Sequence, residues 1–399
     1  MYTYVVRKGD TLYRLARRFG IHVNSIVNAN PQLENPNVLV PGQVINIPER
    51  GSNLYVVQPG DTLYDISIRF QVPMEQLAAA NPDVDPAMLI PGQSLIIPPG
   101  AELQIVDTMT DYGYMEMTED LEQLSRKYPF LELTDIGSSV MGKRIPLVKI
   151  GQGRKKVHFN GSFHANEWIT TVLLMRFLED YAEAVMHDGV LRGERARYLY
   201  NNASLWIVPM VNPDGVELVQ EGVTSDHPYY RSLLEWNEGS FDFSSWKANI
   251  RGVDLNDQYP AHWEVERGRR VVLGPGPRDY VGTAPLTEPE ALAIAQLSQN
   301  TQFDEVYAFH TQGEEIYWNY RDLEPPESEQ IALRLAEASG YRAVKLTGSD
   351  AGYKDWFIQE FRRTGFTIEA GIGRNPLPIT DFPSIYQRVL GIMVEGLKA

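Results

Sequence analysis

Cysteine is absent from this chain of 399 residues. Disulfide bonds and thiolate metal ligands are therefore excluded, and any bound zinc must be held by histidine and carboxylate side chains. Basic residues are scarce relative to acidic ones, with 36 Lys and Arg against 52 Asp and Glu, so the formal net charge is −16. Because such a surface repels a polyanion, nucleic acid is not an expected partner.

Long apolar runs are absent as well. No stretch approaches the roughly 18 consecutive apolar residues of a membrane-spanning helix, so no membrane span is expected. The segment Met1–Lys8 has no apolar stretch long enough for a signal peptide, which predicts a cytoplasmic protein. The composition, with 43% hydrophobic and 22% charged residues, is that of a globular protein, and the length suggests two or three domains.

The amino-terminal part of the chain contains an internal repeat. The segment Tyr4–Tyr13 recurs as Tyr55–Tyr64, 51 residues later. Further matching pairs are Phe19 with Phe70, Asn30-Pro31 with Asn81-Pro82, and Pro41-Gly42-Gln43 with Pro91-Gly92-Gln93. This self-similarity predicts two copies of one small domain, at residues 1–50 and 51–100, followed by a larger domain at residues 101–399.

Each copy is expected to fold as strand, helix, helix, strand. A short Tyr-Val-Val strand leads into Gly-Asp-Thr, where Asp10 or Thr11 of the first copy can cap a helix. Over residues 3–49 and 54–98 the two copies resemble lysin motif (LysM) domains. That resemblance implies small α+β domains that bind glycans containing N-acetylglucosamine, such as peptidoglycan. The alternative interpretation is a pair of small spacers without a ligand.

The larger domain follows a Pro98-Pro99-Gly100 link and is expected to be α/β. Three segments are predicted to be buried strands, and each is followed by a side chain able to bind a metal or move a proton. The pairs of segment and side chain are 156–162 with His164, 306–309 with His310, and 365–368 with Glu369. Open α/β sheets place their ligands at the carboxyl ends of strands, so we expect these three side chains to lie close together.

Two histidines and a glutamate provide a ligand set for zinc. Glu167 lies three residues after His164, near the start of a predicted helix, so both side chains can face one point, and His310 supplies the third ligand. Three protein ligands leave a fourth position open, as in catalytic zinc sites. Each histidine taken singly has a second interpretation as a hydrogen-bonded core imidazole, and Glu369 as a solvated carboxylate.

The order of motifs along residues 110–390 resembles the zinc carboxypeptidase (carboxypeptidase A-like) family. The matching motifs, in chain order, are His164-x-x-Glu167, Asn212-Pro213-Asp214-Gly215, Gly252-Val253-Asp254-Leu255-Asn256, His310, Asp355-Trp356 and Phe366-Thr367-Ile368-Glu369. The resemblance implies a mixed sheet flanked by helices and one Zn²⁺ per chain. It further implies that His164, Glu167 and His310 bind the zinc and that Glu369 is the general base.

The oxyanion of the reaction needs a cation beside the metal. The family places an arginine in a Trp-Arg segment, where this chain has Trp246-Lys247. Lys247 matches by position, and Arg251 is the other candidate, so the resemblance leaves both open.

One departure from the family concerns substrate recognition. Exopeptidases of the family follow the Asn of the Gly-Val-Asp-x-Asn motif with an arginine, and the pair grips the substrate's terminal carboxylate. Here the pair is Asn256-Asp257. An aspartate repels a carboxylate and attracts an ammonium group, which predicts a substrate whose side chain carries an amine.

Diamino acids of bacterial peptidoglycan fit this expectation. One branch of the family joins LysM repeats to the zinc domain and has Asn-Asp-Gln at this place, as in Asn256-Asp257-Gln258. Its members are γ-D-glutamyl-L-diamino acid endopeptidases of spore-forming bacteria. The resemblance implies hydrolysis of the bond between γ-D-glutamate and meso-diaminopimelate or lysine. It also implies spore association. Lys354 and Arg374 are candidates for binding the α-carboxylate of the D-glutamate.

Two other functions remain open from the sequence. One is a zinc carboxypeptidase acting on another C-terminus, against which Asp257 argues. The second is a glycan-binding protein with an inactive hydrolase domain, against which the complete ligand set and Glu369 argue. The sequence does not indicate the oligomeric state.

Overall fold

The computed structural model describes residues 2–7, 10–19, 26–27, 29–33, 39–47, 54–57, 61–70, 72, 74–82, 84–86, 88–97 and 104–398. Its chain divides into two compact units, Met1–Gln104 and Ile105–Ala399. The Pro98-Pro99-Gly100 link and the glycines of the two Gly-Asp-Thr turns lie outside the described residues.

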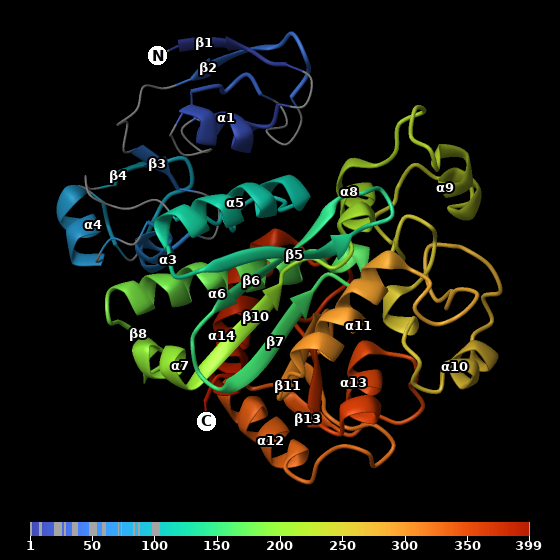
Figure 1. Ribbon diagram of the computed structural model, residues 1–399. Coiled ribbons are helices and arrows are strands. Elements are labelled where there is room, and N and C mark those ends of the chain that lie inside the picture. The colour runs from blue at the N-terminus through green and yellow to red at the C-terminus, as the bar shows by residue number, and fades with distance from the viewer. Residues whose placement is uncertain are drawn as a thin grey trace. The chain divides into compact units, whose positions relative to one another are not determined.

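Both amino-terminal repeats pair a first strand with a last strand (Figure 1). In the first repeat β1 (Tyr2–Val5) runs antiparallel to β2 (Val44–Ile47), and α1 spans Leu12–Phe19. The second repeat has antiparallel β3 and β4 with two helices between them, at Leu54–Val56, Ser94–Ile96, Leu63–Arg69 (α3) and Met74–Ala80 (α4). The expected strand, helix, helix, strand order is confirmed in the second copy.

The repeated Asn-Pro pair has a structural role in both copies. Asn81 Nδ2 donates to Leu77 O at 2.8 Å and to Ile96 O at 2.7 Å, while its Oδ1 accepts from Ile96 N at 2.6 Å. Asn30 makes the same three bonds, to Ile26 and Asn46. One buried amide thus satisfies backbone groups of both a helical turn and a strand, which explains why this residue recurs with the fold.

The larger unit is built on an eight-stranded mixed sheet (Figure 1). Four parallel strands form its centre, in the order β10 (Ala203–Val208), β7 (Lys155–Gly161), β11 (Glu305–His310) and β14 (Thr364–Glu369). The outer strands are β6 (Arg144–Ile150) and β5 (Glu132–Ser138) on one side, and β12 (Glu315–Tyr317) and β13 (Arg342–Val344) on the other.

Helices cover both faces of this sheet, and alternate residues of β11 face each layer. Tyr307 and Phe309 pack with α5 (Tyr114–Lys127), α6 (Ile169–Met186), α7 (Ala196–Asn202), α12 (Ser328–Ser339) and α14 (Phe382–Gly396). Val306 and Ala308 pack with α11 (Pro289–Thr301) and α13 (Tyr353–Phe361). The expected α/β class, with a mixed sheet flanked by helices, is confirmed.

The remaining elements connect these layers. They are the hairpin β8 (Val190–Leu191) and β9 (Glu194–Arg195), helices α8 (Pro213–Glu221), α9 (Tyr230–Trp236) and α10 (Trp263–Arg269), and the 3₁₀ turns η1 (Ala165–Glu167), η2 (Leu255–Asp257) and η3 (Ile379–Asp381). Among the described residues, no helix has the length and apolar character needed to cross a membrane.

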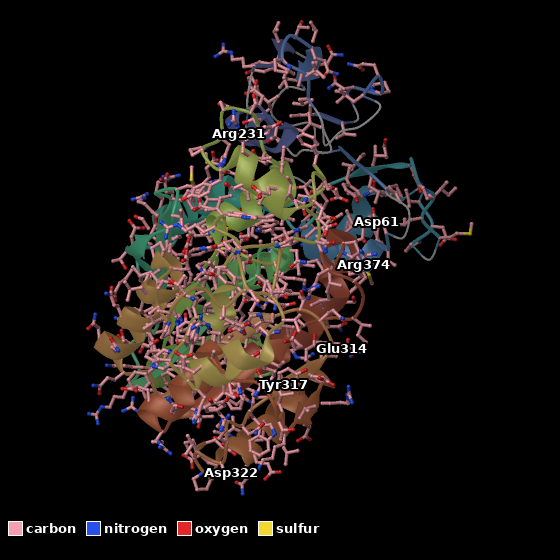
Figure 2. The ribbon with its side chains drawn as sticks, turned by 90° about the vertical axis from the view of Figure 1, so that its right-hand side faces the viewer. Asp61, Arg231, Glu314, Tyr317, Asp322 and Arg374 are labelled. Atoms are coloured by element: carbon pink, nitrogen blue, oxygen red, sulfur yellow. The ribbon has the colours of Figure 1, made fainter. Side chains whose placement is uncertain are left out.

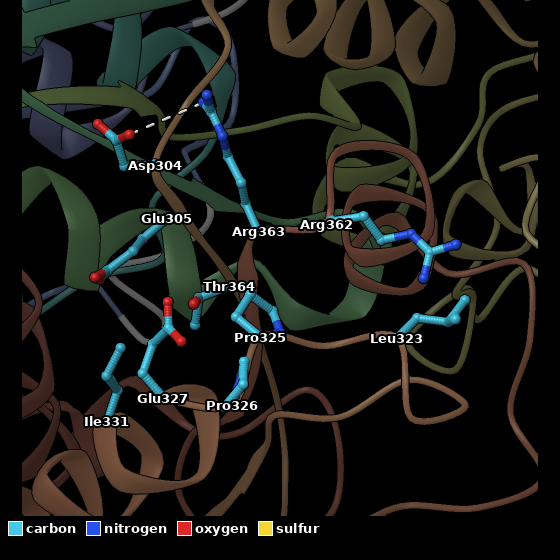
Figure 3. Close-up of a pocket in the computed structure, with 10 residues that line it drawn as sticks. All are labelled: Asp304, Glu305, Leu323, Pro325, Pro326, Glu327, Ile331, Arg362, Arg363 and Thr364. Atoms are coloured by element: carbon cyan, nitrogen blue, oxygen red, sulfur yellow. Dashed lines mark ion pairs between the residues drawn. The ribbon is translucent and has the colours of Figure 1, made fainter.

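The two edges of the parallel strands differ in character. His310 and Glu369 end β11 and β14 and are paired in register at the carboxyl edge. At the amino ends of the same strands, Glu305 and Thr364 line a pocket of about 520 Å³ that also contains Arg362 and acidic side chains (Figure 3). The predicted ligands therefore lie at the edge opposite to this pocket.

Candidate metal centre

Three buried side chains meet at the carboxyl edge of the sheet. His164 precedes η1, Glu167 ends it just before α6, and His310 closes β11. Each offers one ligand atom, and these atoms all lie within 4.8 Å of one another. Residues 143 positions apart are thus brought to one point by the parallel pairing of β7 with β11.

The outer nitrogen of His164 fixes the direction of its ring. His164 Nε2 lies 3.2 Å from Asp254 Oδ1, while Nδ1 lies 2.8 Å from Glu167 Oε1. His310 Nδ1 lies 3.0 Å from Glu167 Oε2. Two Nδ1 atoms and a carboxylate therefore converge, and a carboxylate behind a histidine is the usual support of a zinc ligand. The donor set suits zinc, since two histidine nitrogens and one carboxylate are the three protein ligands of many catalytic zinc sites.

Electrostatics holds this cluster together. Burial opposes the charged form of His164, but Glu167 and Asp254 outweigh it and raise the pKa of His164 to about 9. Burial likewise opposes a charged Glu167, yet the two histidines bring its pKa well below the usual value. The site thus concentrates negative charge on buried carboxylates beside imidazole nitrogens, an arrangement that attracts a cation.

Glu369 ends β14 beside this cluster. It is paired in register with His310 on β11 and with Glu315 on β12. Burial, followed by the charge of Glu167, raises the pKa of Glu369 to about 8. This carboxyl group is therefore able to take up and release a proton near neutral pH.

The structure separates the two candidate cations. Lys247 Nζ lies 3.0 Å from Asp254 Oδ2, and Asp254 also contacts His164. Burial disfavours the charged amine, but Asp254, Asp257 and Glu167 outweigh it, so the pKa of Lys247 is raised. Arg251 is 43% exposed and directed to Glu288, at 3.6 Å. Lys247 thus lies within the charge network of the cluster.

A buried asparagine that sequence reasoning missed shapes the turn between Lys247 and Asp254. Asn249 Oδ1 accepts from Arg251 N at 3.0 Å and from Val253 N at 3.1 Å. Its Nδ2 donates to Glu288 Oε2 at 2.7 Å. Lys247, at one end of this turn, pairs with Asp254 at the other end, and Asp254 contacts His164 of the cluster. Asn249 therefore positions Lys247 and Asp254 from outside the site.

Glu290 lies behind this turn and gives a prediction for stability. It is fully buried, accepts from Val140 N at 3.0 Å, and has its pKa raised to about 7 by burial and by the charges of Asp214 and Glu288. Its neutral form therefore stabilises the fold below the usual pKa of 4.5, and this contribution is lost as the pH rises through 7.

Glu290→Gln keeps a neutral side chain at every pH. We expect the free energy of unfolding of the variant, minus that of the wild type, to be larger at pH 8 than at pH 5 by about 2 kcal/mol, so that the variant is relatively more stable at pH 8. Urea denaturation at the two pH values measures this difference. An equal effect of the substitution at both pH values would contradict the raised pKa.

The predicted substrate residues Asn256 and Asp257 lie in and at the end of η2, next to the cluster. Asn256 Oδ1 accepts from Tyr353 N at 3.2 Å, at the start of α13. Asp257 Oδ2 lies 2.7 Å from Arg270 Nη2, and the Asp257 side chain is only 7% exposed. Burial and the charge of Asp254 raise the pKa of Asp257 to about 7. Asp257 is therefore a buried carboxylate that is already paired with Arg270.

The two cations predicted to bind a substrate carboxylate have different surroundings. Lys354 is buried, with Nζ 2.6 Å from Asn319 O and 2.5 Å from Asp355 Oδ1. Arg374 is exposed on the loop that follows β14, where Figure 2 shows it. Of these two, Arg374 has the exposed guanidinium that a ligand can reach.

A second residue missed by sequence reasoning supports Glu167. Asn375 Nδ2 lies 3.4 Å from Glu167 Oε1 and donates to Thr311 O at 2.9 Å. Its Oδ1 accepts from Thr311 Oγ1 at 2.8 Å, and Thr311 N lies 3.3 Å from Glu167 Oε2. Asn375, on the loop after β14, and Thr311 thus hold the Glu167 carboxylate from two sides.

Removing this support should weaken metal binding. We expect Asn375→Ala to raise the dissociation constant for zinc about 10-fold, the lower end of the effect of losing an outer partner of a ligand. Competition with a chromogenic chelator measures it. Ile372→Ala is the matched control, because Ile372 lies on the same loop and is exposed. Equal affinities of the two variants would show that Asn375 does not support Glu167.

Comparisons with known proteins agree with this geometry. A family model described as zinc carboxypeptidase matches residues 117–376, and the LysM domain model matches residues 4–48 and 55–98. Gamma-D-glutamyl-L-diamino acid endopeptidase 1 of Lysinibacillus sphaericus is 45% identical over 392 residues, covering 86% of this chain and 99% of the relative. The uncharacterized protein YqgT of Bacillus subtilis is 41% identical, covering 72% and 77%.

Solved structures show the same fold at low sequence identity. Bovine thrombin-activatable fibrinolysis inhibitor, in complex with tick carboxypeptidase inhibitor, superposes with a TM-score of 0.57 at 17% identity, covering 73% of this chain and 97% of that chain. Carboxypeptidase A from Helicoverpa armigera gives a TM-score of 0.56 at 17% identity, with coverages of 83% and 79%. These likenesses concern the fold alone.

Proposed function

This chain belongs to the zinc carboxypeptidase family, and on that basis we propose that it hydrolyses the bond between γ-D-glutamate and a diamino acid in peptidoglycan peptides. The proposed diamino acid is meso-diaminopimelate. The observation that carries the proposal is the His164, Glu167, His310 cluster with Glu369 beside it. The substrate is supported by the Lysinibacillus sphaericus relative, which aligns along nearly its whole length and is named as such an endopeptidase.

The proposed metal is one zinc ion, held by His164 Nδ1, Glu167 and His310 Nδ1. When bound there, zinc supplies a Lewis acid that polarises the scissile carbonyl and makes water a better nucleophile at neutral pH. Asp254 keeps the His164 ring in the orientation that points Nδ1 inward. Asn375 and the backbone of Thr311 keep the Glu167 carboxylate in place.

Glu369 is the proposed general base. Its carboxylate accepts a proton from the attacking water and then donates that proton to the leaving nitrogen of the diamino acid. The buried position of Glu369 supports this role, because burial raises its pKa towards neutrality. Lys247 is the proposed partner of the developing oxyanion, since its ammonium group is charged and lies in the network around Asp254.

Substrate binding is proposed to involve the loops around this edge. The Nδ2 group of Asn256 is a candidate donor to the diamino acid, since its Oδ1 is already used by Tyr353 N. Arg374 is the proposed partner of the D-glutamate α-carboxylate, because its side chain is exposed. Lys354 is proposed to stabilise the neighbouring part of the binding site, since its Nζ atom donates to Asn319 O.

The two LysM domains are proposed to hold the enzyme on glycan that contains N-acetylglucosamine. We propose domains at residues 1–50, 51–100 and 101–399, and a cytoplasmic, spore-associated location during sporulation. The LysM matches support contact with the cell wall. Fractionation of sporulating cells, with detection of the enzyme by antibody, tests the location.

Digestion of a defined muropeptide tests the function. With the zinc-loaded enzyme, L-Ala-γ-D-Glu-meso-diaminopimelate should yield L-Ala-D-Glu and free meso-diaminopimelate, identified by mass spectrometry. A parallel peptide with a blocked carboxyl group on the terminal residue distinguishes an endopeptidase, which cleaves it, from a carboxypeptidase, which does not. Bound zinc without any product that contains diaminopimelate would reject the proposal.

A further inference from the structure

The ion pair of Asp257 brings an additional cation to the metal centre. Arg270 follows α10 directly, and its Nη2 atom lies 2.7 Å from Asp257 Oδ2. Its Nε atom lies 2.9 Å from Glu266 Oε1, and Nη1 lies 3.4 Å from Asp279 Oδ1. Three carboxylates therefore hold the Arg270 guanidinium in a fixed place. An arginine with a single partner on the surface is usually more mobile.

The chain around Arg270 lies against the segment that carries Lys247 and Asp254. Lys247 N donates to Pro277 O, and Asp254 N donates to Tyr280 O, both at 2.8 Å. The charges also interact, since Asp254 and Asp257 raise the pKa of Arg270, as does Glu266, against the effect of burial. Arg270 thus belongs to the structure that surrounds the metal centre.

The guanidinium keeps capacity for a further ligand. An arginine carries five N–H donors, and the three carboxylates each approach a different nitrogen. The Arg270 side chain is 29% exposed, whereas Asp257 is 7% exposed. A group that arrives from solvent therefore meets the arginine more readily than the aspartate, although both charges contribute to the field.

A cation surrounded by acids selects a particular kind of ligand. A lone carboxylate would be repelled by Asp257, Glu266 and Asp279, whereas a zwitterion presents its carboxylate to the arginine and its ammonium to the acids. The distal end of diaminopimelate is such a zwitterion, with an amine and a carboxylate on one carbon. Lysine carries only the amine at that position.

We propose that Arg270, positioned by Asp257, is a specificity-determining residue that binds the distal carboxylate of a diaminopimelate side chain. The inference rests on the proposed function and specifies it further, because it predicts a preference for diaminopimelate over lysine. The acids around Arg270 accept the distal ammonium. Asp257 thereby contributes to binding as the holder of the arginine, in place of the direct role expected from the sequence.

Two tripeptides that differ only in this carboxylate test the proposal. L-Ala-γ-D-Glu-meso-diaminopimelate and L-Ala-γ-D-Glu-L-lysine are digested by each enzyme form, and the ratio of their kcat/KM values is measured. The wild type should favour the diaminopimelate peptide about 10- to 100-fold, the value of a hydrogen bond to a charged group. Arg270→Gln should bring the ratio close to one, mainly through KM for the diaminopimelate peptide.

Arg267→Gln is the matched control, because Arg267 lies on α10 and contacts residues of its own helix, with a long ion pair to Glu264 at 3.9 Å and its guanidinium over the Trp263 ring. It should keep the wild-type ratio. Arg270→Lys keeps the charge for the three carboxylates, so it serves if Arg270→Gln fails to fold. It should lower the ratio several-fold, because an ammonium cannot form the fork of a guanidinium.

The outcomes distinguish a failure of the proposed role of Arg270 from a failure of the proposed function. Equal losses on both peptides in Arg270→Gln and Arg270→Lys would overturn the role of Arg270 and leave the proposed function intact. A wild type that cleaves both peptides equally well would do the same. If the zinc-loaded wild type cleaves neither peptide, the proposed function fails, and the inference fails with it.

Discussion

Glu369→Gln should lower kcat by about 10³-fold, within the usual range for loss of a general acid–base group. Glutamine has nearly the shape of glutamate, so the packing at the end of β14 should persist. It cannot accept the proton of the attacking water or return it to the leaving nitrogen. Because the loss concerns the chemical step, KM should change little. Steady-state kinetics on L-Ala-γ-D-Glu-meso-diaminopimelate measures both constants.

Zinc content is the essential control for this variant. Glu369 does not belong to the converging set of His164, Glu167 and His310, so Glu369→Gln should bind as much zinc as the wild type. Glu369→Asp retains a carboxylate at a greater distance and should show an intermediate rate. Wild-type turnover in a zinc-loaded Glu369→Gln protein would reject the general-base role.

Lys247→Met should lower kcat by about 10²-fold, at the lower end of the effect of removing one oxyanion donor. Methionine is similar in length but carries no charge, so the developing negative charge on the carbonyl oxygen loses its partner. Lys247→Arg should recover part of the rate, because the charge is restored with a different shape. The measurement is single-turnover hydrolysis, which isolates the chemical step from product release.

Arg251→Met is the informative comparison, since the two cations lie on one turn and the sequence leaves both open. Arg251 is paired with Glu288 and lies outside the network of Asp254. Its loss should therefore change the single-turnover rate less than about 3-fold, as expected for a partly exposed ion pair. The assignment would be reversed if Arg251→Met showed the larger defect. Circular dichroism of both variants excludes a loss of folding.

Much of the architecture could be predicted from the sequence because its signals are local. Two LysM copies repeat a turn, a helix face and an Asn-Pro pair at nearly constant spacing. The buried strands of the larger unit are marked by short segments rich in apolar and aromatic residues; His310 and Glu369 end two of them, and His164 lies three residues after the third. Because parallel strands align their carboxyl ends, adjacency of these side chains follows from topology alone.

Other features of the site have no such local signal. Asn375 and Glu167 lie 208 positions apart, and Asn249 and Glu288 lie 39 apart. Their contacts depend on how loops from different parts of the chain pack against one another. An asparagine in a loop has no spacing that distinguishes a buried hub from a solvated turn, so sequence reasoning could not identify these two residues.

The pair Asp257 and Arg270 shows the same limit for charge. By itself the sequence determined that Asp257 stands where exopeptidases of the family have an arginine, and that three candidate metal ligands and a candidate base occur in the order of the family. Only the tertiary structure decided that Arg270 neutralises this aspartate, that Lys247 rather than Arg251 joins Asp254, and that Asn375 supports Glu167. The physical reason is that the effect of a charge depends on its burial and its partners, and both arise only when distant segments pack together.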